Sequence, residues 1–138
     1  MIIENKDVID RYRGARVCGL CRHPTLNTDP HHVRTRGNSG SDVDMNIVAI
    51  CRKCHNGVAT TKEGELACRE IIAKRLGCTA QDVWDANNFI AERLDKDDSE
   101  VRLAERIMTA VGDGTLTAVA ARMVEDALIA SGRLTLEK

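Results

Sequence analysis

The stretch that decides the fold reads CGLC at residues 18–21, DPHHVRTRGNSGSD at 29–42 and MNIVAICRKCHN at 45–56. Between Cys18 and His55 lie four of the six cysteines and all four histidines of this 138-residue chain. Thiolate and imidazole are the side chains that most often bind transition metals in proteins. The stretch therefore predicts a small module with two metal sites, one for a structural zinc and one for a catalytic ion.

Four of the cysteines form two Cys-x-x-Cys pairs with 29 residues between them: Cys18, Cys21, Cys51 and Cys54. Each pair places two sulfurs on one tight turn, and two such turns brought together make a tetrahedral four-thiolate site. Four thiolates leave no open coordination position, so the zinc expected here is structural. Free buried cysteines in a reducing compartment are the alternative, but the paired spacing favours zinc.

The segments on either side of the loop at 34–45 are expected to be extended and to pair in antiparallel fashion. Pro30 disfavours a helix in residues 28–33, and residues 46–50 are apolar and β-branched. The loop itself is rich in Gly, Ser, Asn and Asp. A short helix is expected within residues 4–14, and another from Arg52 to about Gly57, after which Gly64 is expected to break the pattern.

The rest of the chain has helical periodicity throughout, which predicts an all-helical C-terminal half. The expected helices cover residues 65–76, 79–94, 99–111 and 117–131. Thr79 followed by Asp82 resembles an N-cap with an acidic residue at N3, and Ser99 is the next N-cap. Val119, Met108 and Met123 are expected to face the core. The predicted fold class is α+β and mostly helical, with a module at 1–64 and a helical extension at 65–138.

Charge is distributed unevenly along the chain, although the formal net charge is only −1. Residues 11–62 hold nine basic and three acidic side chains, whereas residues 65–138 hold ten basic and fourteen acidic ones. A basic module is expected of a protein that meets phosphates. No apolar run approaches membrane-spanning length, and MIIENKDVID at 1–10 is not a signal peptide, so a cytoplasmic protein with no membrane partner is expected.

The order of residues in this stretch resembles the HNH nuclease family, in its zinc-bearing four-cysteine branch. The resemblance is carried by HH at 31–32, N at 46 and CH at 54–55, and covers roughly residues 16–60. It implies a zinc-stabilised ββα-metal module that hydrolyses phosphodiester bonds in DNA, leaving a 5′-phosphate and a 3′-hydroxyl. Because a compact nuclease of this kind looks like those found in phages and mobile elements, the resemblance implies a protein of that type.

The resemblance also implies a role for each polar residue of the motif. His31 and His55 would bind the catalytic divalent ion, for which Mg²⁺, Mn²⁺ and Ni²⁺ are all open. Because neighbouring residues of a strand point to opposite faces, His32 would do a different task, that of the general base. Asn46 would hydrogen bond to backbone across the loop and keep His32 aimed.

Arg34 and Arg36 are placed where they would hold flanking DNA phosphates. Many members of the HNH family carry a further histidine four residues after the last one of the motif. This chain has Ala59 at that position, so only two histidines remain for the catalytic ion. Three acidic residues could add oxygen ligands, although acids near such a loop more often form turns: Asp29, Asp42 and Asp44. His23 is expected to be a surface or capping residue.

Two other functions remain open at this point. A zinc-stabilised nucleic-acid-binding module without catalysis would share the scaffold, but it has no need for His32, Asn46 and His55 in register. An interaction protein would act through residues 65–138, which could also form a homodimer or bind a partner protein. The sequence favours the DNA endonuclease, and Cys68 and Cys78 are expected to be small core residues.

Overall fold

The computed structural model describes residues 1–135 and shows a mostly helical α+β protein with one two-stranded sheet, as the sequence predicts. Its helices and strands are α1 (Lys6–Tyr12), β1 (Asp29–His32), β2 (Ile47–Ile50), α2 (Arg52–Asn56), α3 (Lys62–Leu76), α4 (Ala80–Arg93), α5 (Glu100–Gly112) and α6 (Ala118–Ala130). Three short 3-10 helices complete it: η1 (Arg36–Asn38), η2 (Asp44–Asn46) and η3 (Val58–Thr60). None of the helices in the described part of the chain is long and apolar enough to cross a membrane.

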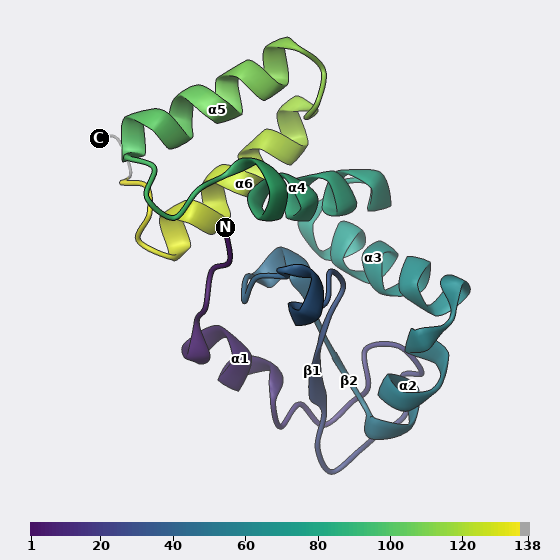
Figure 1. Ribbon diagram of the computed structural model, residues 1–138. Helices are drawn as coiled ribbons and strands as arrows, with labels where there is room; N and C mark the ends of the chain where they lie inside the picture. The colour runs from purple at the N-terminus through teal and green to yellow at the C-terminus, as the bar shows by residue number, and fades with distance from the viewer. Residues whose placement is uncertain (136–138) are drawn as a thin grey trace.

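The strand pair lies at one end of the molecule, with α1 on one side of it and α2 on the other, while α4, α5 and α6 form the opposite end (Figure 1). β1 and β2 are antiparallel, with His31 opposite Val48 and His32 opposite Ile47, which confirms the predicted pairing. β2 is almost entirely buried, as expected for a β-branched apolar strand. The sheet is thereby anchored through β2, and β1 presents its polar side chains on both faces.

Two helices of the C-terminal half, α4 and α5, begin at the capping residues that the sequence predicts. Thr79 and Asp82 form a complete capping box at the start of α4, and the Ser99 side chain accepts from the backbone N–H of Arg102 at the start of α5. The Thr117 hydroxyl caps α6 and also donates to Asp82 Oδ1 at 2.7 Å. The two N-termini of α4 and α6 are therefore tied to each other through one carboxylate.

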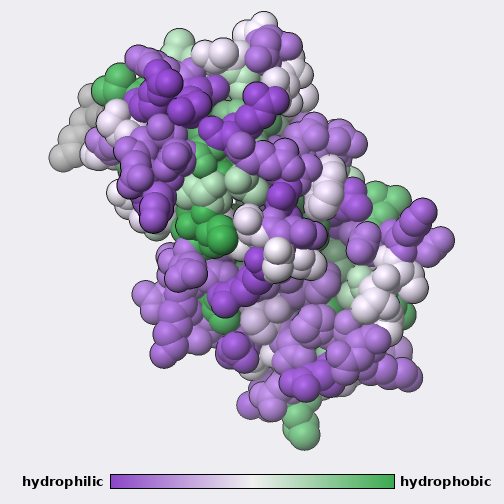
Figure 2. Space-filling model, in the orientation of Figure 1, coloured by the Kyte–Doolittle hydropathy of each residue, from purple (hydrophilic) through white to green (hydrophobic). Residues whose placement is uncertain are grey.

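One hydrophobic cluster runs through both predicted segments of the chain. It joins Ile50 and Cys54 from the strand pair and α2 to Ile72 in α3, and continues to Leu128 in α6. The surface in Figure 2 is mostly hydrophilic, with small and separate hydrophobic areas. The boundary predicted after residue 64 falls inside α3, and the last three residues of the predicted extension, 136–138, lie outside the described part.

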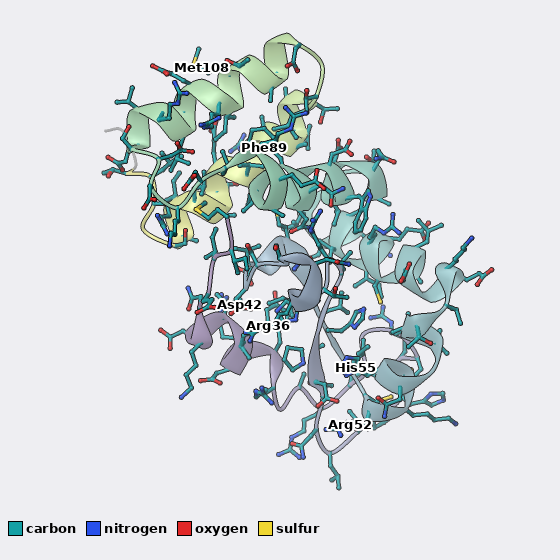
Figure 3. The ribbon with its side chains drawn as sticks, in the orientation of Figure 1. Arg36, Asp42, Arg52, His55, Phe89 and Met108 are labelled. Carbon is teal, nitrogen blue, oxygen red and sulfur yellow. The ribbon has the colours of Figure 1, made fainter. Side chains whose placement is uncertain are left out.

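The prediction that Met108 in α5 and Val119 in α6 face the core is wrong. Met108 is 74% exposed and lies on the outer side of α5 (Figure 3), and Val119 at the start of α6 is 47% exposed. Met123 is buried, as predicted. The buried residues of α5 are instead Leu103, Ile107 and Ala110, which form the stripe that faces the rest of the protein. α5 packs against α6 through one side only, so its second apolar stripe faces solvent.

Gly64 does not break the helical pattern, as the sequence suggested, but lies inside the first turn of α3. Its backbone N–H donates to the hydroxyl of Thr61, the N-cap residue, at 3.0 Å. A side chain at this position would overlap the backbone carbonyl of Val58 in η3. Glycine is needed here because the start of α3 lies directly against η3.

We expect Gly64→Ala to destabilise the protein, although alanine normally favours a helix by about 1 kcal/mol over glycine. Relieving the overlap with Val58 requires α3 to move away from η3, at a cost of about 1–3 kcal/mol. Denaturant unfolding measures the difference. Gly112→Ala in α5 is the matched control, because no neighbouring group lies within 4 Å of the place that its methyl group would take. Equal stability of Gly64→Ala and Gly112→Ala would contradict this close approach.

Candidate functional site

The four paired cysteines meet in space. Cys18 and Cys21 lie on the loop before β1, and Cys51 and Cys54 lie at the start of α2. The four sulfurs all lie within 4.8 Å of one another, and Cys21 and Cys51 have their sulfurs 3.9 Å apart. Sulfurs that surround a tetrahedral zinc at about 2.3 Å are about 3.8 Å apart. The cluster can therefore bind a metal ion such as zinc.

Backbone hydrogen bonds make one of these thiols unusually acidic. The N–H groups of Leu20 and Cys21 both point at Cys18 Sγ, at 3.4 Å. Burial acts to raise the pKa of Cys18, but backbone N–H groups outweigh it and lower this pKa to about 6. Burial and the neighbouring thiols raise the pKa of Cys54 to about 12. Full ionisation of the cluster therefore requires a bound cation, as in a metal site.

The first cysteine pair is fastened directly to the sheet. The Gly19 N–H donates to the carbonyl of Ala49 in β2 at 2.8 Å, and a side chain at Gly19 would come within 2.9 Å of that oxygen. Cys51 follows β2 with no intervening loop. The cysteine cluster thus joins the turn of Cys18 and Cys21, β2 and α2 at one point.

Two imidazoles from different elements face each other beside this cluster. The rings of His31 in β1 and His55 in α2 have centroids 5.3 Å apart and planes at 77°. This is close to the roughly 5 Å expected for two imidazoles that bind one tetrahedral ion through nitrogens about 2.0–2.1 Å from it. Asp29, two residues before His31, also faces His55, with its Oδ2 at 3.3 Å from His55 Nδ1.

The protonation of His31 suits metal binding. Burial, together with the charges of the neighbouring His55 and His32, lowers the pKa of His31 to about 4, so His31 is neutral at neutral pH. Arg52 Nε donates to Asp29 at 2.7 Å, and this hydrogen bond holds the pKa of Asp29 below its ordinary value. An ionised carboxylate only accepts, so His55 Nδ1 donates to it and leaves Nε2 as the free ligand atom.

His32 contacts a different carboxylate. Its Nε2 lies 2.8 Å from Oδ1 of Asp42, whose side chain is 3% exposed. Arg36 donates to both oxygens of Asp42, at 2.9 and 2.8 Å, and the Asn5 N–H donates to Oδ2 at 3.0 Å. Burial acts to raise the pKa of Asp42, but these donors lower it below its ordinary value. Figure 3 shows Arg36 and Asp42 together on the α1 side of the strand pair, and His55 on the α2 side.

Asn46 is fully buried and makes the cross-loop hydrogen bonds that the sequence predicts for it. Its Oδ1 accepts from the Arg34 N–H at 2.8 Å, and its Nδ2 donates to the carbonyls of Arg34 and Ser41 at 3.0 and 2.9 Å. The amide therefore ties the two ends of the loop between β1 and β2 together. It also places Ser41, and with it the next residue, Asp42, against the end of β1.

The two arginines expected at DNA phosphates are engaged within the protein. Arg34 is 16% exposed and donates to the Asn38 carbonyl and to Asn88 Oδ1 of α4, both at 2.6 Å. Arg36 is paired with Asp42. Their contact with DNA stays a prediction, and each has a structural contact that the sequence did not reveal.

Sequence reasoning also missed that Asp29 and Asp42 each bind a histidine. Asp29 could have been found, because it lies two residues before His31 and so on the same face of the strand. No comparable signal points to Asp42, which is ten residues from its partner His32.

The fold and the cysteine cluster define a class: a mostly helical α+β protein whose strand pair and adjoining helix carry a four-cysteine site for a metal ion such as zinc. Comparison with protein-family models, with curated proteins and with solved structures finds no match for this chain.

Proposed function

We propose that the protein is a metal-dependent DNA endonuclease of the HNH type, with roughly residues 16–60 forming a ββα-metal module. The observation that carries this proposal is the meeting of the His31 and His55 rings at 5.3 Å. Two imidazoles held edge to face by a strand and a helix are suited to share one divalent ion. The adjoining cysteine cluster, which can hold a structural zinc, supports the same assignment.

His31 and His55 are the residues that would hold the catalytic ion, whether Mg²⁺, Mn²⁺ or Ni²⁺. When bound, such an ion would stabilise the negative charge that develops on the phosphate and on the leaving oxygen. Asp29 orients His55 for this task by accepting from its Nδ1, and Arg52 keeps Asp29 ionised. Imidazole ligands favour Ni²⁺ over Mg²⁺, whereas Mg²⁺ prefers oxygen ligands.

His32 supplies the base for the hydrolysis. Its imidazole takes a proton from a water molecule whose oxygen then bonds to the phosphorus atom. The bond between phosphorus and the 3′-oxygen breaks, and this oxygen takes a proton from solvent. The products are a 5′-phosphate and a 3′-hydroxyl. The excess of basic side chains in residues 11–62 favours DNA as the polymer that brings this phosphate.

The helical half, residues 65–138, would have a role separate from catalysis. The exposed stripe on α5, which includes Val101 and Met108, is available for a second copy of the chain or for a partner protein. The catalytic residues all lie in β1, α2 and the loop between the strands, so the helical half would position the nuclease and leave the chemistry to the module.

Cleavage assays test the nuclease directly. Zinc-loaded protein is incubated with supercoiled, linear, single-stranded and branched DNA in the presence of Mg²⁺, Mn²⁺ or Ni²⁺. We expect nicks that appear only with an added divalent ion, that EDTA prevents, and that DNA ligase reseals because they carry 5′-phosphate and 3′-hydroxyl ends. Absence of cleavage of all four DNAs with every ion would refute the assignment.

A non-catalytic nucleic-acid-binding module is the second candidate. It is favoured by one observation: within residues 1–135 the four cysteines are the one group of three or more Cys, His, Asp or Glu side chains arranged to hold a metal ion, and His31 and His55 belong to no such group. DNA binding that weakens steeply with salt, without cleavage under any of the conditions above, would support this candidate.

A further inference from the structure

The imidazole proposed as general base is held at one nitrogen by a buried carboxylate. His32 Nε2 lies 2.8 Å from Asp42 Oδ1. Asp42 is also the acceptor for Arg36 at both oxygens and for the Asn5 N–H. Both carboxylate oxygens are thus satisfied by donors of the protein, which leaves Asp42 no free position for a metal ion.

The contacts of Asp42 decide which nitrogen of His32 carries the hydrogen. A carboxylate that faces a guanidinium and a backbone N–H is ionised, and an ionised carboxylate accepts hydrogen bonds but donates none. Neutral His32 must therefore carry its hydrogen on Nε2. Nδ1 then has the free lone pair, and it makes no hydrogen bond to any residue within 1–135. Nδ1 is the atom left to accept a proton.

We propose that Asp42 is the positioning residue for the general base, holding His32 in the Nε2–H tautomer so that Nδ1 takes the proton from the attacking water. This inference rests on the proposed nuclease function and gives Asp42 a role in the same site. The proton of the water goes to Nδ1, the hydrogen on Nε2 stays there, and Asp42 stabilises the imidazolium without being protonated. Arg36, which the sequence predicts at a DNA phosphate, also holds Asp42 in place.

A purely structural role is the rival explanation, because Asp42 also fastens the loop to the N-terminal segment through Asn5. The two roles differ in what they predict for the ring of His32. If Asp42 only fastens the loop, the tautomer of His32 does not depend on it. If Asp42 positions the base, losing its charge changes the tautomer and slows the chemical step while DNA binding is kept.

Asp42→Asn separates these roles, with Asp44→Asn as the matched control. Asp44 lies two residues further along the same loop, and its carboxylate accepts from Tyr12 and Arg11. We expect Asp42→Asn to lower kcat for plasmid nicking by about 10–10²-fold, with KM changed less than about threefold. Nitrogen-15 NMR of the zinc-loaded protein should show His32 with its hydrogen on Nε2 in the unsubstituted protein and in Asp44→Asn, and a mixture of tautomers in Asp42→Asn.

Each outcome decides the proposal. A His32 that carries its hydrogen on Nδ1 in the unsubstituted protein overturns it, even if Asp42→Asn fails to fold. A loss of kcat in Asp42→Asn without any change of tautomer also overturns it and assigns Asp42 to the loop. If the unsubstituted protein cleaves no DNA but shows the Nε2–H tautomer, the nuclease function itself fails, and the contact between Asp42 and His32 is structural.

Discussion

Replacing His32 with alanine is expected to abolish the nicking of supercoiled plasmid DNA while leaving the fold and the zinc content intact. The substitution removes the group that takes a proton from the attacking water, and such groups contribute about 10²–10⁴-fold to a reaction rate. The cysteine cluster does not include His32, and Asp42 keeps its contacts with Arg36 and Asn5. Initial rates of nicking at saturating divalent ion, with metal analysis of both proteins, measure the effect.

His23→Ala is the control for this experiment, because His23 is exposed and the other three histidines lie in the proposed site. It should nick plasmid DNA at the rate of the unsubstituted protein. DNA binding by His32→Ala should also be unchanged, since a base acts on the chemical step. Equal cleavage rates for His32→Ala and His23→Ala would remove His32 as the base.

The second large effect is expected from Cys51→Ser, which should release the metal ion and unfold the strand pair and α2. Serine does not replace the thiolate, because its hydroxyl stays protonated at neutral pH. Cys51 joins the end of β2 to the start of α2, and its sulfur also accepts from the Cys54 N–H. Cys18, Cys54 and Ile72 belong to one hydrophobic cluster, so the loss should spread from the cysteine site into α3.

The expected size of this effect follows from the energy of structural zinc sites. Zinc binding contributes about 10–16 kcal/mol in small zinc-dependent modules, so loss of the ion removes about as much stability as a typical domain has. Metal analysis and thermal unfolding by circular dichroism measure it. Cys78→Ser is the matched control, since Cys78 lies outside the cluster and should keep one zinc per chain. A full zinc content in Cys51→Ser, or none in the unsubstituted protein, would refute the four-cysteine zinc site.

Much of the secondary structure could be predicted because its signals are local. The capping box of Thr79 and Asp82 and the cap at Ser99 lie within the turns that they begin. Within each cysteine pair the two residues are three positions apart, which likewise predicted two tight turns that each carry two sulfurs. The structure brings these two turns together. Such signals act over three or four residues, so they hold whatever the rest of the chain does.

The errors arise where a residue faces another helix or strand of the structure. The sequence predicted a helix break at Gly64 because glycine disfavours helices. In the structure, the absence of a side chain at Gly64 leaves room for the backbone of Val58. α5 carries two apolar stripes with helical spacing, one through Val101 and Met108 and the other through Leu103 and Ile107. Periodicity alone cannot choose between two stripes on one helix, and only the position of α6 does so.

By itself, the order of residues determined the strand pair, the helices with their caps, and the grouping of four thiols into one cluster that could bind a metal ion, because these depend on close neighbours and on period. The tertiary structure alone decided which acid holds each imidazole: Asp29 for His55, 26 residues away, and Asp42 for His32. The side chain of Asp42 on its loop can reach several partners, and the hydrogen bond from the Asn46 side chain to the Ser41 carbonyl, together with the burial of β2, decides which one it contacts. Those contacts exist only once the whole chain has folded.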